Sequence, residues 1–239
     1  MGLEAIVTAA GVSGGVLAWG AFARNSPIFG RVQRRLTRGE GTGDVTGDYR
    51  AVALTFDDGP NPQSTPRILD TLGEAGVTAT FFVLGRHADR WPSLVARMSA
   101  EGHAVANHGY HHRKLTFRGP RYVRDDIAHG TAAIERAGGP RPTLFRAPHG
   151  QRNPWVTPIA RTAGQRTVGW TLGVWDTARP GASVIADRVI RGATPGAIVL
   201  LHDGDGYDPL GDRTQTANAV PLLLRGLHER GFSFAALGR

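Results

Sequence analysis

The sequence predicts an α/β fold, a distorted (β/α)7 barrel that is closed or nearly closed. The chain has 239 residues, of which 41% are apolar and 20% charged. This length and this apolar fraction are enough to bury a substantial core. From residue 50 onward, seven short apolar runs alternate with six helical stretches, as in βα units around a parallel sheet. An open doubly wound sheet is the alternative, but no Gly-x-Gly-x-x-Gly follows the first run, where a dinucleotide fold would place it.

Each element has a local signal in the sequence. Runs rich in β-branched and apolar residues predict strands at 51–56, 78–84, 103–107, 143–146, 167–172, 197–201 and 232–237. Helices are expected between them, near 64–75, 92–101, 120–137, 154–163, 182–192 and 215–230. Pro92 marks the start of the second helix, Gly102 follows its end, and Gly231 closes the last one.

The N-terminal region predicts a separate role. Residues 5–23 carry no charge and are long enough to span a bilayer, so 1–23 reads as a transmembrane anchor or a signal segment. A basic and then Gly-rich linker is expected over 24–48, and one folded domain over 49–239. Five arginines follow the apolar run, and the positive-inside rule would keep them cytoplasmic. We therefore expect a membrane-associated or extracytoplasmic protein whose orientation is open: a retained anchor, a cleaved signal or a cytoplasm-facing anchor.

Composition narrows the chemistry and the partners. The chain has no cysteine, so any metal must be held by histidine or carboxylate. Lys and Arg number 28 against 20 Asp and Glu, a net charge of +8, which could indicate an anionic polymer or a membrane surface. Only Lys114 is a lysine, and no arginines cluster with aromatic residues as an RNA-binding platform requires. We expect no nucleic-acid partner, and a monomer.

Ionisable residues follow five of the seven predicted strands. In parallel α/β barrels the site lies at the carboxyl ends of the strands, so these side chains should converge on one rim. They are Asp57 and Asp58, His108 and His112, Arg146, Asp176, and His202.

Two of these groups predict a metal site. Asp57 and Asp58 leave their strand on different sides, which suits one carboxylate to a metal and the other to substrate; an acidic turn is the plainer alternative. His108 and His112, spaced i and i+4, can face one metal from a helical turn, and an exposed His-rich loop is the alternative. His111 is expected to point away. One carboxylate and two imidazoles leave zinc open positions for water and substrate, the composition of a catalytic site.

The other rim residues predict proton chemistry. Arg146 follows an apolar strand, where its guanidinium can bind a carboxylate in fork geometry and hold it ionised. Asp176 can raise the pKa of His202, so that the imidazole is protonated and ready to donate. Alone, each could be a surface arginine or a packed histidine; the coincidence of five strand ends favours a site.

Taken in order, these residues resemble the polysaccharide deacetylase family of carbohydrate esterases, the chitin and peptidoglycan deacetylases that share the NodB homology domain. The resemblance covers about residues 50–237. It implies Asp57 as general base, His202 as general acid, Arg146 as the residue that orients the base, and Asp176 at the acidic position of the fourth motif. It implies Asp58, His108 and His112 as ligands of a divalent metal, with Zn2+ favoured and Co2+, Mn2+ or Ni2+ as alternatives. It further implies a substrate-binding wall that includes His149, Trp175 and Leu200.

Three positions depart from the family pattern. Gly109 stands where Ser or Thr is usual, so a hydroxyl that braces the histidine loop is missing. Thr177 replaces a usual tryptophan, although Trp175 can supply a similar wall, and His149 replaces a common tyrosine. None of these changes removes a ligand, base or acid, so they bear on substrate fit.

The expected activity is metal-assisted removal of N-acetyl groups from peptidoglycan- or chitin-like glycans, with release of acetate. O-deacetylation of acetylated polysaccharide such as xylan is an alternative, because the same groups cleave esters. A non-catalytic protein that binds envelope polymer is another, and a phosphotransferase site is disfavoured because Gly59 stands where such sites want a carboxylate. Two loops are expected to shape the groove and so to select the glycan, at residues 113–121 and 205–216.

Overall fold

Short parallel strands form the centre of the molecule. A computed structural model describes residues 25–37 and 50–238. The strands are β1 (Ala51–Asp57), β2 (Thr80–Val83), β3 (Ala104–Asn107), β4 (Leu144–Phe145), β5 (Arg166–Thr167), β6 (Leu172–Gly173), β7 (Ile198–His202) and β8 (Ser233–Phe234). Their order in the sheet is β5-β4-β3-β2-β1-β7-β6, and β8 pairs with the start of β1. All of these pairings are parallel, so the α/β prediction is confirmed.

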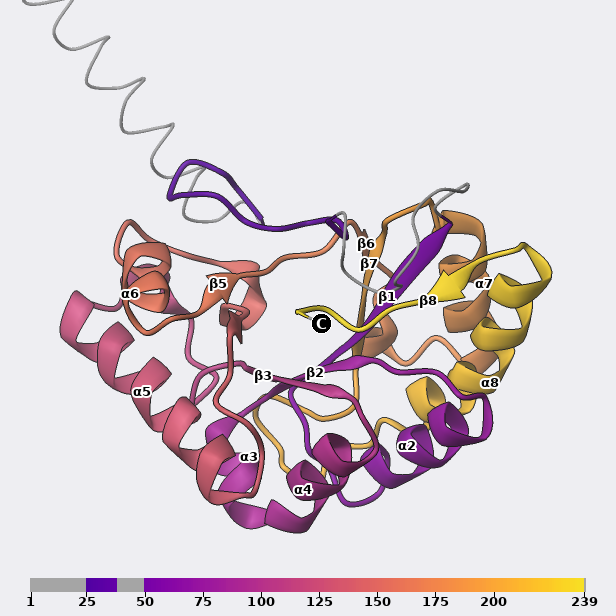
Figure 1. Ribbon diagram of the computed structural model, residues 1–239, viewed down its shortest axis with the longest axis horizontal. Coiled ribbons are helices and arrows are strands. Elements are labelled where there is room, and N and C mark those ends of the chain that lie inside the picture. Colours follow the sequence, from indigo (N-terminus) through magenta and orange to yellow (C-terminus); the bar gives the residue numbers. More distant parts are fainter. Residues whose placement is uncertain (1–24, 38–49, 239) are drawn as a thin grey trace, which may run out of the picture.

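Helices connect the strands and cover the outside of the curved sheet (Figure 1). They are α2 (Thr65–Glu74), α3 (Gly85–Arg90), α4 (Pro92–Ala100), α5 (Pro120–Arg136), α6 (Val156–Thr162), α7 (Ala182–Gly192) and α8 (Thr214–Glu229). Three 3-10 turns lie between them: η1 (Leu115–Phe117), η2 (Pro148–Gly150) and η3 (Asp176–Ala178). The short helix α3 directly follows β2 and was not expected from the sequence.

The first strand is the centre of the core. Every residue of β1 is buried, which fits a strand covered on both faces. Its apolar side chains pack with those of β2 and β7 and with the inner faces of α2, α7 and α8. Phe56 stacks on Phe81, with ring centroids 5.2 Å apart. This packing fixes the carboxyl end of β1, from which Asp57 and Asp58 emerge.

The predicted strand 167–172 is wrong in detail. It is divided into β5 and β6, which lie at the two opposite ends of the sheet. Gly169, between them, lies where an added Cβ would come within 2.1 Å of Oδ1 of Asn25, so the N-terminal segment approaches the backbone too closely for a side chain. The chain therefore crosses the opening of the sheet here and does not form one continuous strand.

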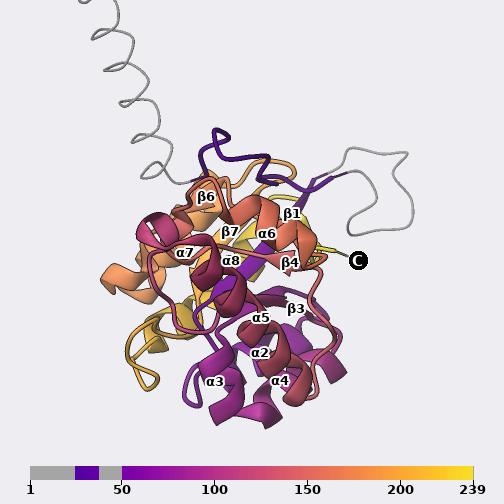
Figure 2. The ribbon, with the colours of Figure 1, turned by 90° about the vertical axis from the view of Figure 1, so that its left-hand side faces the viewer.

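Residues 25–37 run across this opening (Figure 1). Gln33 forms a parallel bridge with Val168, and Arg35 an antiparallel bridge with Ala197. Phe29 and Leu36 are buried. Figures 1 and 2 both place this segment on the side of the sheet opposite to α2, α3 and α4. This part of the predicted 24–48 linker thus packs against the domain.

The predicted membrane or signal segment, 1–23, lies outside the described residues, as does the Gly-rich stretch 38–48. Within 25–37 and 50–238, no helix combines the length and the apolar character that a membrane span requires.

Arg152 holds the N-terminal segment in place, and its removal should loosen that segment. The buried guanidinium donates to the carbonyl oxygens of Ser26, Phe29 and Gly30 and, at 2.6 Å, to the hydroxyl of Thr157. Because Arg152→Met leaves these acceptors without their donor, we expect a loss of about 1–3 kcal/mol in unfolding free energy. Urea unfolding measures this loss, and amide hydrogen exchange should show reduced protection over residues 25–37.

The matched control is Arg225→Met, an exposed position of α8 away from residues 25–37. It should leave both measurements near the wild-type values. Unchanged exchange of residues 25–37 in Arg152→Met would show that the segment is held by other contacts.

Candidate active site

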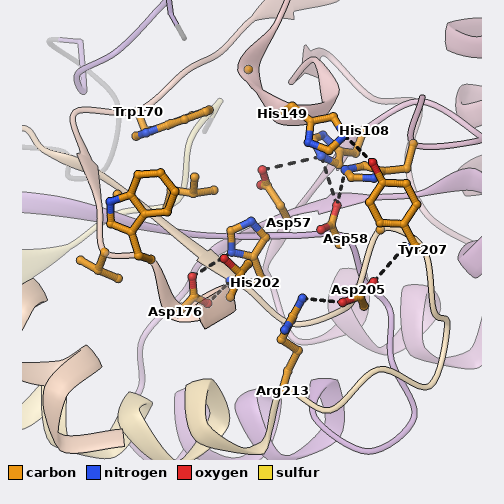
Figure 3. A pocket seen from close by; sticks show the side chains of 18 residues that line it. Asp57, Asp58, His108, His149, Trp170, Asp176, His202, Asp205, Tyr207 and Arg213 are labelled. Carbon is orange, nitrogen blue, oxygen red and sulfur yellow. Dashed lines mark hydrogen bonds and ion pairs between the residues drawn. The ribbon is translucent and has the colours of Figure 1, made fainter. Parts of the chain in front are cut away.

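The predicted rim residues line one cavity of about 460 Å³ at the carboxyl ends of the strands (Figure 3). All the singled-out ionisable residues lie on or directly behind its wall. The lining is Asp57, Asp58, His108, His112, His149, Gly150, Trp170, Gly173, Val174, Trp175, Asp176, Thr177, Leu200, His202, Asp205, Gly206, Tyr207 and Arg213. Arg146 is fully buried behind Asp57.

Three side chains converge as a group that could hold a metal ion. One ligand atom from each of Asp58, His108 and His112 lies within 4.8 Å of the others. Oδ1 of Asp58 is 3.3 Å from Nε2 of His108 and 3.0 Å from Nε2 of His112. This oxygen is buried, and no donor besides these imidazoles reaches it in the described part of the chain. A buried carboxylate oxygen facing two imidazole nitrogens fits a divalent cation.

The electrostatics and the hydrogen bonds of the group fit a cation as well. Burial disfavours the charge of Asp58, but His112 and His108 outweigh burial and hold the pKa of Asp58 well below its ordinary value. Burial also acts against protonation of His108, yet Asp57 and Asp58 together raise its pKa. Nδ1 of His108 donates to the carbonyl of Arg146 at 2.8 Å, which directs Nε2 toward Asp58. The negative field that favours a proton here would equally favour a metal ion.

The two histidines do not reach this site from a helical turn, as the spacing predicted. They lie in a loop after β3, where Gly109 has φ +80° and His112 has φ +57°. These left-handed residues fold the loop back so that both imidazoles face Asp58. His111 is exposed, outside the ligand group, as expected.

Asp126 of α5 braces this loop. Its buried carboxylate accepts the backbone N–H groups of Tyr110, at 3.2 Å, and His111, at 3.1 Å. The carboxylate occupies the space beside Gly109, where an added Cβ would come within 2.4 Å of it. Oδ1 of Asn107 accepts the N–H of Gly109 at 2.8 Å. The support that a Ser or Thr hydroxyl would have supplied at position 109 thus comes from a residue 17 positions later.

A buried arginine fixes Asp57. Nη1 of Arg146 donates to Oδ1 of Asp57 at 2.6 Å and to the hydroxyl of Thr55 at 2.8 Å. Nη2 donates instead to the carbonyl of Gly169 at 2.8 Å, so the expected two-nitrogen fork on one carboxylate is wrong. The guanidinium also lies over the ring of Phe82, 3.9 Å from its centroid. Burial lowers the pKa of Arg146, and the neighbouring Asp57 opposes this effect.

Asp176 holds His202 by two contacts. Nδ1 of His202 donates to Oδ1 of Asp176 at 2.9 Å, and the backbone N–H of His202 donates to Oδ2 at 2.8 Å. The hydroxyl of Thr216 donates to the same Oδ2. Burial acts against the charged imidazole, but Asp176 outweighs it and raises the pKa of His202 to about 9. The ring is therefore a cation at neutral pH, with Nε2 left for the cavity.

The three predicted substrate-binding residues line the cavity. Trp175 is 60% exposed and in a left-handed conformation, which turns its ring outward beside Thr177. Leu200 lies on β7, and His149 lies in the turn η2 with φ +61°. Burial, and then His112, lower the pKa of His149 to about 4, so its ring is neutral.

Sequence reasoning missed two residues of the wall, Trp170 and Tyr207, and one support behind it, Thr55. Trp170, placed in a predicted strand, stands over Arg146, and Thr55 supports that arginine from inside β1. The hydroxyl of Tyr207 lies 3.0 Å from Nε2 of His149. Tyr207 belongs to the 205–216 loop that was expected to shape the groove, and its place in that loop was the only sequence feature that indicated a role in the site.

Comparison with known proteins identifies the family. The polysaccharide deacetylase family model matches residues 44–168. A chitooligosaccharide deacetylase from Rhizobium leguminosarum bv. trifolii is 43% identical over 196 residues, 80% of this chain and 91% of the relative. The chain belongs to the polysaccharide deacetylase family. A second member, a peptidoglycan-N-acetylglucosamine deacetylase from Bacillus cereus, is 36% identical over 201 residues, 82% of this chain and 90% of the relative.

One solved structure in this family shows why the site residues matter. A family 4 carbohydrate esterase pseudoenzyme from Bacillus anthracis superposes with a TM-score of 0.72 at 28% identity. The match covers 80% of this chain and 64% of that one. Since this fold also occurs in a pseudoenzyme, membership of the polysaccharide deacetylase family does not by itself establish catalysis. The residues of the cavity decide whether the chemistry is available.

The ion pair of His202 with Asp176 can be tested by titration. In the metal-free protein, NMR of the His202 imidazole should give a pKa of about 9. In Asp176→Asn the value should fall toward the ordinary value of about 6.5, because the compensating charge is gone. A raised pKa in the folded state means that this pair stabilises the protein fully below about pH 6.5, and that the stabilisation is lost as pH rises through about 9. Asp205→Asn, which removes another carboxylate of the same cavity, should shift the His202 titration far less.

The brace from Asp126 can be tested by metal affinity. Asp126→Ala frees the backbone of the histidine loop, so zinc affinity should fall about 10- to 100-fold in a chelator-competition titration. Asp125→Ala, the exposed neighbour on the same helix, should bind zinc like the wild type. Equal zinc affinity in the two variants, with both folded by circular dichroism, would contradict a bracing role.

Proposed function

We propose that this chain is a metal-dependent hydrolase that removes N-acetyl groups from amino-sugar polymers or oligomers and releases acetate. One observation carries the proposal: a single cavity combines a possible cation site, a carboxylate fixed by a buried arginine, and a charged histidine. In Figure 3, Asp176 and His202 lie on one side of Asp57, and Asp58 and His108 on the other. The names of the Rhizobium and Bacillus relatives, a chitooligosaccharide deacetylase and a peptidoglycan-N-acetylglucosamine deacetylase, support the same reaction class.

The cation would be held by Asp58, His108 and His112. Two imidazoles and one carboxylate suit zinc, with Co2+, Mn2+ or Ni2+ as alternatives. When bound, a divalent cation supplies Lewis-acid polarisation of the acetyl carbonyl. The ligand loop and Asp126 keep the two imidazoles directed at one point beside Asp57.

Asp57 acts as the general base. Arg146 bonds Oδ1 and leaves Oδ2 directed toward the cavity, 3.7 Å from Nε2 of His108. This oxygen takes a proton from water as the water attacks the acetyl carbon. The carbonyl oxygen becomes an oxyanion, and the backbone N–H of His149, which has no acceptor in the described part of the chain, donates to it.

His202 acts as the general acid. Its imidazole is charged at neutral pH and is held by Asp176, so Nε2 can protonate the departing nitrogen. Breaking the C–N bond then releases acetate and a free amine on the sugar. Amide hydrolysis depends on this acid because an unprotonated amine is a poor leaving group. The rings of Trp175 and His149, with Leu200, form the wall on which the sugar rests.

The same groups would cleave an acetyl ester, so acetylated xylan is the comparison substrate for specificity. A non-catalytic envelope-polymer protein would need neither Asp57 nor His202 in these positions. We further propose that the domain works at the cell envelope, with residues 1–23 as its membrane anchor or signal segment, on the basis of the uncharged run 5–23.

Two variants distinguish the proposed role of Asp57 as base from that of the metal ligands. Asp57→Asn should bind zinc like the wild type but lose about 10²–10⁴-fold in kcat, because the proton acceptor is gone. His108→Ala should lose both zinc and activity. Acetate release from N-acetylglucosamine oligomers, with and without chelator, and zinc content measure these effects.

Thr162→Ala, at an exposed position of α6, serves as the control with unchanged zinc content and kcat. A fully active Asp57→Asn enzyme would refute the mechanism. Release of acetate from xylan alone would assign the chain to ester substrates.

A further inference from the structure

A second hollow adjoins the active-site cavity. It has a volume of about 420 Å³ and is lined by His112, Arg113, Lys114, Phe117, Arg118 and Tyr207. His112 and Tyr207 line the active-site cavity as well, so the two spaces share a wall. We call this hollow the basic groove. The shared wall therefore places the basic groove next to the cavity in which the reacting sugar would lie.

The cations of the basic groove have no acidic partner among the residues that the structure describes. Arg113, Lys114 and Arg118 bring three positive charges to its wall, and no carboxylate lines it. None of the three forms an ion pair in the described part of the chain; Arg118 instead lies over the ring of Tyr122 at 4.9 Å. In contrast, the cations within the active site are matched, Arg146 to Asp57 and Arg213 to Asp205. Three unmatched cations around one hollow repel one another and favour an anionic ligand.

The loop on one side of the basic groove is well fixed. Leu115 is fully buried and anchors the turn η1 in the core. The buried side chain of Asn153 donates to the carbonyls of Leu115 at 2.7 Å and Arg118 at 2.8 Å. Phe117, between these two anchors, is nevertheless 76% exposed. A fixed loop therefore presents a large aromatic ring to the groove.

The loop on the other side is fixed in the same way. Asp205 pairs with Arg213 at 2.7 Å and accepts the N–H of Tyr207 at 2.9 Å. Gly206 lies against the ring of His112, where an added Cβ would come within 2.0 Å of Nδ1. Tyr207 is held in place by these contacts while remaining 62% exposed. Two exposed aromatic rings offer apolar faces to the C–H faces of a sugar, and the cations offer contacts to an acidic substituent.

We propose that the basic groove binds a carboxylate-bearing sugar next to the sugar that is deacetylated, so that the preferred substrate is an acidic amino-sugar glycan and not a neutral one. This inference rests on the proposed deacetylase function. The guanidinium groups of the basic groove suit a carboxylate-bearing sugar because guanidinium binds carboxylates in planar geometry.

The experiment compares three soluble tetramers with the zinc-loaded protein. One is the neutral N-acetylglucosamine tetramer. The second alternates N-acetylglucosamine with a sugar that bears a lactyl ether carboxylate, and the third is the same tetramer with each carboxylate converted to its methyl amide. Exposed ion pairs contribute up to about fivefold each, so the acidic tetramer should have a KM about five- to thirtyfold below that of its methyl amide. High salt should reduce this preference.

The variant Arg113→Gln/Lys114→Gln/Arg118→Gln should abolish the preference for the acidic tetramer while leaving kcat and the KM for the neutral tetramer within about twofold of wild type. The matched control, Arg31→Gln/Arg161→Gln/Arg225→Gln, removes the same charge from exposed positions elsewhere and should retain the preference. Equal KM values for the acidic tetramer and its methyl amide, or a preference that survives in the groove variant, would overturn the proposal.

A binding measurement separates this inference from the proposed function. Calorimetric titration of zinc-loaded Asp57→Asn with the same three tetramers reports on the groove without turnover. Preference for the acidic tetramer without acetate release from the wild type would leave the groove assignment standing and refute the deacetylase. Acetate release by the wild type without any preference in binding would support the deacetylase and refute the groove assignment.

Discussion

Arg146 couples the parts of the active site. Its side chain, fully buried, bonds the carboxylate of Asp57, the hydroxyl of Thr55 and the carbonyl of Gly169. Its own carbonyl accepts the Nδ1 proton of His108. One residue therefore sets the position of the proposed base and the direction of one proposed metal ligand. A buried guanidinium is costly unless it is paired and hydrogen-bonded. Both Nη atoms of Arg146 are bonded, so the carboxyl end of β1, the strand β4 and the crossing near Gly169 must be placed together.

The cavity concentrates carboxylates, and a bound divalent cation would balance the negative charge beside Asp58. Arg146 pairs with Asp57, whereas Asp58, equally buried, faces the imidazoles of His108 and His112. A neighbouring carboxyl, Asp203, shows the effect: burial, together with Asp58 and Asp57, raises its pKa to about 7, and it is bonded by the hydroxyl of Thr65. Carboxyl groups this close in low dielectric cannot all ionise unaided. A divalent cation beside Asp58 would satisfy the remaining charge, which is why the ligand group and the base belong to one electrostatic unit.

The basic groove extends the same electrostatic argument outward. At the active site Arg146 pairs with Asp57 and Arg213 with Asp205, whereas the three cations of the adjoining basic groove have no acidic partner in the described part of the chain. The family includes relatives named for chitooligosaccharides and for peptidoglycan. The groove offers a physical basis by which this chain would favour an acidic glycan, while the buried residues would perform the same chemistry on either.

The sequence by itself determined the parallel α/β class and the strand ends that bear the chemistry. Both depend on local features, since a strand buried on both faces is a continuous apolar run, and its end is marked by the first polar residue. The order of strands grouped the pair Asp57 and Asp58 with His108 and His112, and the family resemblance assigned Asp58 to the metal. Other features depended on contacts between distant segments. The strand expected at 167–172 is divided at Gly169, whose carbonyl accepts a hydrogen bond from Arg146 and whose Cα lies against Asn25. The histidines converge through left-handed backbone at Gly109 and not through a helical turn.

The tertiary structure alone decided the brace from Asp126, the partner of His149 and the basic groove. Asp126 lies 15 residues from the N–H that it holds, and Tyr207 lies 58 residues from His149. Arginines 113 and 118 did not stand out from the many others in the chain until folding placed them beside Tyr207 and away from any carboxylate. Local sequence specifies which residues leave a strand, whereas burial and charge matching between separate loops determine which of them act together.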